Sequence, residues 1–150
     1  MRSRLVGGAV VILLVGCSSV PPKAQTHSKA DVTVGAIRPP GSSALLQSSV
    51  IDATVAYRID GFLADPNRYY LSIQFDKTGG GSFNHYHRFT DEPVLTTAQG
   101  EVHVTYALSN VWSDQRLKKP IRLWFYLTER TGPHDSVVIG QAGPIEYAVK

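Results

Sequence analysis

The sequence predicts an all-β fold, an antiparallel β-sandwich of about seven or eight strands, from three observations. From Asp31 onwards, apolar and polar residues alternate with a period of two, as in strands with one buried and one solvated face. Turn-forming residues recur at short intervals, and no helical period interrupts them. Without helices to cross over, the strands should be antiparallel, and two sheets are needed to bury the apolar faces. A small closed barrel is the alternative architecture.

The individual strands follow from this alternation. The clearest are expected at residues 51–59, 69–75, 102–108 and 121–130, and weaker ones at 32–36, 83–89, 137–139 and 145–149. Residues 94–97 form only a weak extended piece. Turns are expected at residues 39–41, 61–67, 77–82 and 131–133, which are rich in Gly, Pro, Asp and Asn. Pro144 predicts a bulge or an edge position in the last region, because proline donates no ladder hydrogen bond.

This pattern of short strands and turns resembles immunoglobulin and fibronectin type III domains. The resemblance is to a fold class and covers no specific family. The sole cysteine, Cys17, excludes an inter-sheet disulfide, and neither Trp112 nor Trp124 clearly fills the position of the core tryptophan.

The N-terminal segment has the features of an export signal. Arg2 and Arg4 precede an apolar run over residues 5–15, which is too short for a membrane-spanning helix of about 20 residues. The run ends in Leu14-Val15-Gly16-Cys17, which resembles the lipobox of bacterial lipoproteins. The resemblance implies cleavage before Cys17, lipidation of its thiol and acylation of the new amino terminus. An ordinary signal peptide with an incidental thiol is the alternative.

Three regions are therefore expected: a signal peptide (residues 1–16), a lipidated cysteine with a flexible tether (17–30) and the β-sandwich (31–150). The tether is polar and contains Pro21-Pro22, so it would hold the domain up to ~40 Å from the membrane. Ser18 stands where an Asp is the usual inner-membrane retention signal of such lipoproteins. The resemblance thus implies the outer membrane of a diderm bacterium, with the domain facing the periplasm or the exterior.

The charge balance argues against a nucleic-acid partner. The chain has 15 Lys and Arg against 12 Asp and Glu, and Arg2 and Arg4 would leave with the signal peptide. The remaining chain is nearly neutral, and its longest basic run is Lys118-Lys119. It lacks the clustered cations that bind a phosphate backbone.

Three histidines form a candidate metal site. His85 and His87 are two residues apart, so in a strand both imidazoles point to one face, and His103 could supply a third ligand. Imidazole suits Cu and Zn. The alternative is that His85 and His87 lie at the margin of the core, since Phe83 and Phe89 share their face.

An aromatic row forms a candidate binding surface. In the strand predicted at residues 121–130, Arg122, Trp124 and Tyr126 lie opposite the apolar face. Trp, Tyr and Arg are enriched at interface hot spots, and aromatic rings also stack on sugars. Trp112, in the connection at residues 110–120, is the fourth candidate residue of this surface. Either that connection covers the row, or these side chains bind a partner.

No sequence motif indicates catalysis. The chain has no Gly-x-Ser-x-Gly elbow, and the glycines at 79–81 lack the Lys and helix of a phosphate loop. We expect a non-catalytic lipoprotein that binds a protein or an envelope polysaccharide, with its covalent lipid on Cys17 and no other cofactor. A Cu- or Zn-binding lipoprotein is the alternative. An enzyme stays open, because folding can assemble catalytic residues without a spacing signature.

Overall fold

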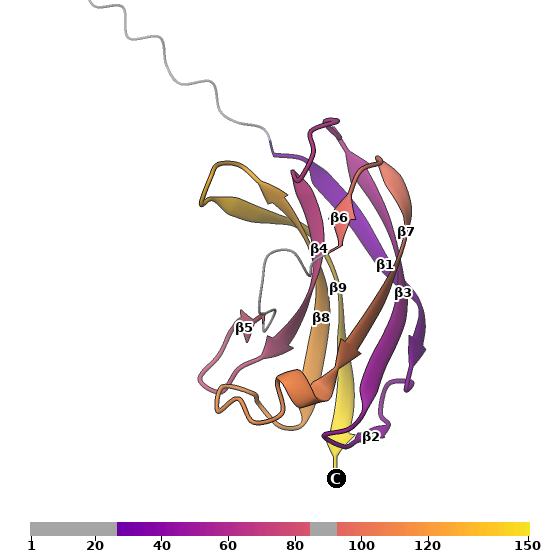
Figure 1. Cartoon of the computed structure of the whole chain (residues 1–150), viewed down its shortest axis with the longest axis vertical. Coiled ribbons are helices and arrows are strands. Elements are labelled where there is room, and N and C mark those ends of the chain that lie inside the picture. The colour runs from indigo at the N-terminus through magenta and orange to yellow at the C-terminus, as the bar shows by residue number, and fades with distance from the viewer. Residues whose placement is uncertain (1–26, 85–92) are drawn as a thin grey trace, which may run out of the picture.

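Two β-sheets pack face to face in the computed structural model, which describes residues 27–84 and 93–150 (Figure 1). The elements are β1 (Lys29–Arg38), β2 (Ala44–Leu45), β3 (Val50–Asp60), β4 (Tyr69–Asp76), β5 (Ser82–Phe83), β6 (Val94–Leu95), β7 (Gln99–Ala107), the 3-10 helix η2 (Leu108–Asn110), β8 (Ile121–Arg130) and β9 (Ser136–Val149). The predicted β-sandwich is confirmed, and its described strands form two open sheets instead of a closed barrel.

The strand order is that of the immunoglobulin fold. One sheet has the order β1-β3-β7, and the other has the order β2-β9-β8-β4-β5, with β6 also paired to β4. This places the long strands β1, β3 and β7 in one layer and the long strands β4, β8 and β9 in the other. Among the strands of residues 27–84 and 93–150, all pairings are antiparallel except the short parallel pairing of β2 with β9. That exception departs from the prediction: after β1 the chain crosses to the second sheet and runs in the same direction as β9.

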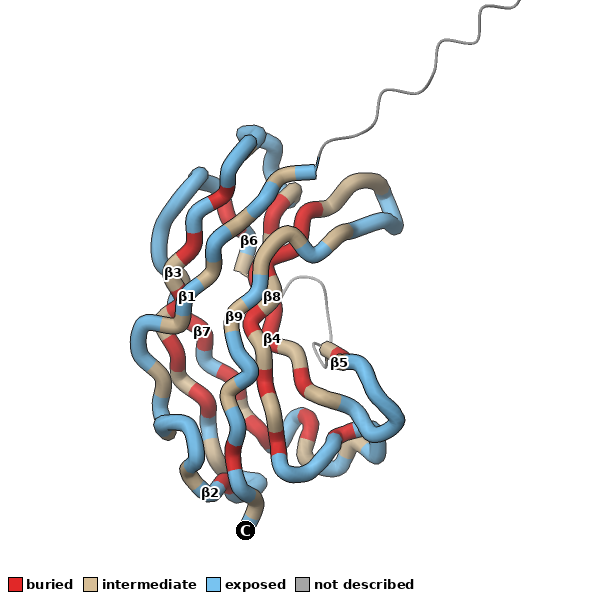
Figure 2. Tube along the Cα trace, turned by 180° about the vertical axis from the view of Figure 1, so that it is seen from behind, coloured by how far each residue is buried: buried red, intermediate tan, exposed pale blue. Residues whose placement is uncertain are grey.

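The core lies between the sheets and follows the predicted alternation. Along β3, the residues at 51, 53, 55, 57 and 59 are buried, and those between them are not (Figure 2). The four largest fully buried side chains all belong to the six-stranded sheet; they are Tyr69, Phe75, Phe125 and Tyr147. The period-two pattern therefore identified the buried face of the main strands.

The connection between β7 and β8 closes one end of the sandwich. Leu108, Val111 and Leu117 turn their side chains into the core and are buried. The backbone of the connection pairs with the end of β4, where the amide of Lys118 donates to the carbonyl of Asp76 over 3.0 Å. The connection thus extends the edge of β4.

Some element boundaries differ from the predictions. β1 begins at Lys29, slightly before the predicted start, and β9 is one long strand where two were predicted. The predicted bulge is present, because the register of β9 against β8 shifts twice. Of the strand predicted at 83–89, β5 is described, and residues 85–92 lie outside the described part.

The long axis of the domain separates its two ends. The described chain begins at one end of the domain, and β2 and the C-terminus lie at the other (Figure 1). Within residues 27–84 and 93–150, no helix is long and apolar enough to cross a membrane.

Candidate functional site

The outer face of the six-stranded sheet carries the predicted aromatic row. Ile121, Leu123, Phe125 and Leu127 of β8 are fully buried in the core, so the residues between them point away from it. Arg122, Trp124 and Tyr126 accordingly lie on the outer face, and each is partly exposed. β8 lies between β4 and β9, and the β8–β9 hairpin and β5 project on this side of the sheet (Figure 1).

The neighbouring strand β4 adds polar groups to this face. Gln74 lies opposite Trp124, and Ser72 lies opposite Tyr126. The amide of Gln74 donates a 3.1 Å hydrogen bond to the hydroxyl of Ser72, which is buried. Thr128, next on β8, is also buried although it faces outward. The face is therefore partly covered around Ser72 and Thr128, and partly open around Arg122 and Trp124.

The indole of Trp124 is held in place by Asp76 at the end of β4. Its Nε1 donates to Asp76 Oδ1 over 2.9 Å. The other carboxylate oxygen, Asp76 Oδ2, lies 3.2 Å from Arg122 Nη1. The ring of Tyr126 meets the indole edge to face, with centroids 6.3 Å apart. One carboxylate thus fixes the orientation of both the indole and the guanidinium.

Arg122 is shared between two carboxylates. Its Nε lies 3.7 Å from Glu146 Oε2 on β9, which is an ion-pair distance but too long for a hydrogen bond. This Nε is itself buried and has no hydrogen-bond partner. The guanidinium carbon lies 6.0 Å from the centroid of the Trp124 ring. The aromatic row therefore ends in a cation that is electrically compensated by Asp76 and Glu146.

Trp112 lies apart from the row of Arg122, Trp124 and Tyr126, and its contacts are with other residues. Its ring lies 4.7 Å from Lys119 Nζ, and it lines a pocket with Leu46 and Lys150 at the end of the domain where the chain terminates. The structure therefore brings Arg122, Trp124 and Tyr126 together and leaves Trp112 elsewhere. The connection at residues 110–120 pairs with the edge of β4.

Of the predicted metal ligands, only His103 lies in the described part of the chain. It points to solvent from β7, in the three-stranded sheet, and its Nε2 lies 3.5 Å from Asp52 Oδ2. Among residues 27–84 and 93–150, no three His, Cys, Asp or Glu side chains are grouped as metal ligands would be. His85, His87 and the predicted lipidation site Cys17 are outside the described residues.

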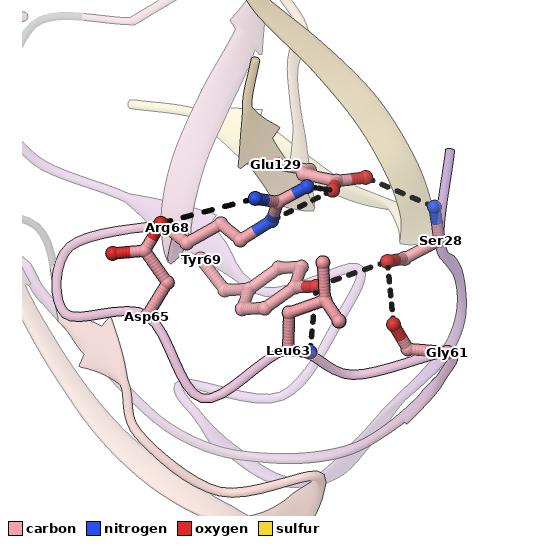
Figure 3. Close-up of polar contacts among 7 residues, drawn as sticks. All are labelled: Ser28, Gly61, Leu63, Asp65, Arg68, Tyr69 and Glu129. Atoms are coloured by element: carbon pink, nitrogen blue, oxygen red, sulfur yellow. Dashed lines mark hydrogen bonds and ion pairs between the residues drawn. The ribbon is translucent and has the colours of Figure 1, made fainter. Parts of the chain in front are cut away.

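A buried ion pair was not predicted. The carboxylate of Glu129 is almost fully buried at the end of β8 and accepts hydrogen bonds from Arg68 Nε (2.9 Å) and Nη2 (2.6 Å) (Figure 3). Its other oxygen accepts the backbone N–H of Ser28 over 2.9 Å. The hydrogen bond to Glu129 raises the pKa of Arg68, so the guanidinium stays charged. The sequence did hold an indication of this: Glu129 falls on the same alternating positions as the apolar, core-facing residues of its strand.

The hydroxyl of Tyr69 extends this network to Ser28, near the first described residue. It lies 3.0 Å from the Ser28 hydroxyl and accepts the backbone N–H of Leu63 over 3.2 Å (Figure 3). Ser28 in turn donates to the carbonyl of Gly61 over 3.2 Å. Ser28 is thereby fixed to both β8 and the turn after β3.

Comparison with known proteins adds no assignment: no protein-family model matches the chain, and no curated protein matches it.

Proposed function

We propose that this chain is a lipid-anchored, non-catalytic binding protein of the bacterial envelope. Cys17 carries the lipid, the following residues form the tether, and the sandwich presents the outer face of β8 and β4 to a protein or an envelope polysaccharide. The outer membrane is the proposed location, since Ser18 follows the cysteine. The observation that carries the binding assignment is the fixed row Arg122–Trp124–Tyr126.

The geometry of this row supports binding for two reasons. First, the row stands on the central strand of a sheet, and Asp76 fixes the indole, so little side-chain freedom is lost when a partner binds. Second, Trp, Tyr and Arg provide large contact areas together with polar groups, the combination typical of binding hot spots. The neighbouring amides and carboxylates could hydrogen-bond a partner peptide or the hydroxyls of a sugar.

Retention on isolated envelope components tests the binding face. Purified wild-type chain and a W124A/Y126A double variant are passed over immobilised peptidoglycan and over solubilised envelope proteins. We expect the variant to lose at least about tenfold in retention, because hot-spot aromatics each contribute more than ~1 kcal/mol. The matched control is H103A/T105A, which changes two side chains on the outer face of the other sheet.

The binding proposal fails if the folded double variant is retained as well as the wild type. A separate experiment tests the anchor: cells receive a clickable palmitate analogue, and the wild type is compared with C17S. Label on the wild type alone supports lipidation at Cys17. Label on neither chain, with the protein exported, would indicate an ordinary signal peptide.

A further inference from the structure

The turn between β3 and β4 carries an exposed apolar segment at the end of the domain where the described chain begins (Figure 1). Leu63 is 52% exposed, and Ala64 and Pro66 beside it are also exposed. The adjacent Phe62 is partly buried, and its ring stacks on that of Tyr69 with centroids 5.1 Å apart. Apolar side chains therefore reach solvent at this end from a turn that is itself packed on the core.

Hydrogen bonds hold the backbone of this turn on both sides of Leu63. The amide of Leu63 donates to the hydroxyl of Tyr69 over 3.2 Å, and its carbonyl accepts the amide of Asp65 over 2.8 Å. The carbonyl of Gly61 accepts the Ser28 hydroxyl over 3.2 Å (Figure 3). The exposed leucine is therefore presented by an ordered turn, and a contact with it would cost little further ordering.

The chain that precedes Ser28 determines which surface the turn faces. Only residues 18–27 separate Ser28 from Cys17, so even a fully extended chain would place the two at most ~35 Å apart. Because Ser28 is bonded to Gly61 at the start of the turn, a lipid on Cys17 would keep the turn close to the bilayer. A tether of this length gives a weak contact a high effective concentration.

The charges that flank the turn are paired, which leaves apolar burial as the driving force for a contact. Arg58 Nη2 lies 3.3 Å from Asp60 Oδ1, and Arg68 Nη1 lies 3.8 Å from Asp65 Oδ2. These four groups carry no net charge, so they give no strong attraction to an anionic surface. Burying a half-exposed leucine favours contact by roughly fivefold, which is effective only for a surface that is already close.

We propose that the turn of residues 61–67 contacts the bilayer that carries the lipid, with the Leu63 side chain inserted at the boundary of the headgroups and acyl chains. The inference rests on the lipidation proposed for Cys17. The contact orients the domain: the end with β2 points away from the membrane, and the outer face of β8 stands at the side, where a partner can reach it. A lipid and a tether alone would not impose this orientation.

Quenching by spin-labelled lipid tests the contact. The full lipid-carrying chain, with its lipid confirmed by mass spectrometry, is placed in phosphatidylcholine vesicles that contain a lipid with a nitroxide on its acyl chain. A fluorescent dye is attached at A64C, next to Leu63, or at Q47C, next to Leu46 at the opposite end; both positions are exposed. The lipid occupies the Cys17 thiol, so the introduced cysteine alone reacts with the dye.

The nitroxide quenches only over short distances, so quenching reports insertion of the turn and not its nearness to the membrane. We expect the dye at A64C to be quenched and the dye at Q47C to keep its fluorescence. Raising the salt concentration should leave the quenching unchanged, because apolar burial and not charge holds the turn.

Two leucine variants separate insertion from tethering. In the A64C background, L63S should lower the ratio of inserted to free turn, read from the quenching, about fivefold. This variant keeps the hydrogen bonds of the turn, which residue 63 makes with its backbone. The matched control is L46S, because Leu46 is 50% exposed at the opposite end, and it should leave the quenching unchanged.

Three results on vesicle-bound protein would overturn the inference: no quenching at A64C, equal quenching at A64C and Q47C, or quenching at A64C that L63S does not reduce. The last result would mean that the tether alone brings the turn to the lipid. Failure of the anchor gives a different result. A wild-type chain that carries no lipid and does not float with the vesicles would refute lipidation at Cys17, and this inference with it.

Discussion

The ion pair of Glu129 with Arg68 gives the sharpest prediction for stability. The Glu129 side chain is 2% exposed, and that of Arg68 is 26% exposed. In E129A the Ser28 amide and two guanidinium donors lose their acceptor, and a small cavity replaces the carboxylate. Breaking a fully buried pair costs about 3–5 kcal/mol, and the partial exposure of Arg68 lets water replace part of the loss. We expect E129A to lower the free energy of unfolding by about 3 kcal/mol.

The conservative variant E129Q should also be destabilised, for a geometric reason. One carboxylate oxygen accepts from Arg68 and the other from Ser28, so either orientation of the amide points its NH₂ at a donor. An unpaired buried donor costs about 1–3 kcal/mol, and we expect a loss of about 2 kcal/mol.

Urea unfolding followed by circular dichroism measures both variants. The matched control is E146A, because Glu146 is an exposed glutamate on the neighbouring strand and should change stability by less than about 1 kcal/mol. A double-mutant cycle with R68A should give a coupling energy of at least about 1 kcal/mol, since the two side chains share two hydrogen bonds. The reasoning is refuted if E129A and E146A unfold at the same urea concentration.

Three further predictions concern other positions. Burial raises the pKa of Tyr147 to about 12. The free energy of unfolding should therefore fall by up to about 3 kcal/mol as pH rises from 10 towards 12, because the unfolded chain ionises first. Urea titrations across that range should show a smaller loss for Y147F. At neutral pH, Y147F should lower the free energy of unfolding by about 1 kcal/mol, because it removes the Tyr147 hydroxyl that donates to the carbonyl of Pro39 over 2.9 Å. An unchanged urea midpoint would contradict this. G140A should lower the melting temperature markedly, because an added Cβ would lie 2.4 Å from the carbonyl oxygen of Ala30; a melting temperature equal to that of the wild type would show that the strands shift freely.

The main strands could be predicted because each has one face in the core. In β3 and β8 the alternation is strict, so the sequence alone separates the buried from the outward residues. The short strand β2 could not be predicted, since its two residues carry no pattern and its pairing depends on where β9 ends. Nor could the sequence show that β9 is one continuous strand, since Gly140 and Gly143 interrupt its alternation. The pairing with β8 on both sides of these glycines makes the strand continuous.

The site residues were predictable only along one strand. Period two places Arg122, Trp124 and Tyr126 on one face, but the role of Asp76 depends on the pairing of β4 with β8, which brings together residues 48 positions apart. Trp112 was grouped with the row by residue type alone, and the fold places it at another end. Alternation could have flagged Glu129 as a carboxylate on the core side, although not its partner Arg68.

The attachment of Ser28 determines how a pull on the N-terminal end enters the domain. A strand fixed only by its ladder is peeled away one hydrogen bond at a time. Here Ser28 is bonded to the Glu129 side chain on β8 and to the turn after β3, ahead of the first residue of β1. Tension therefore reaches both sheets together before β1 bears it alone. A force applied to the segment before Ser28 is therefore shared between β8 and the turn after β3.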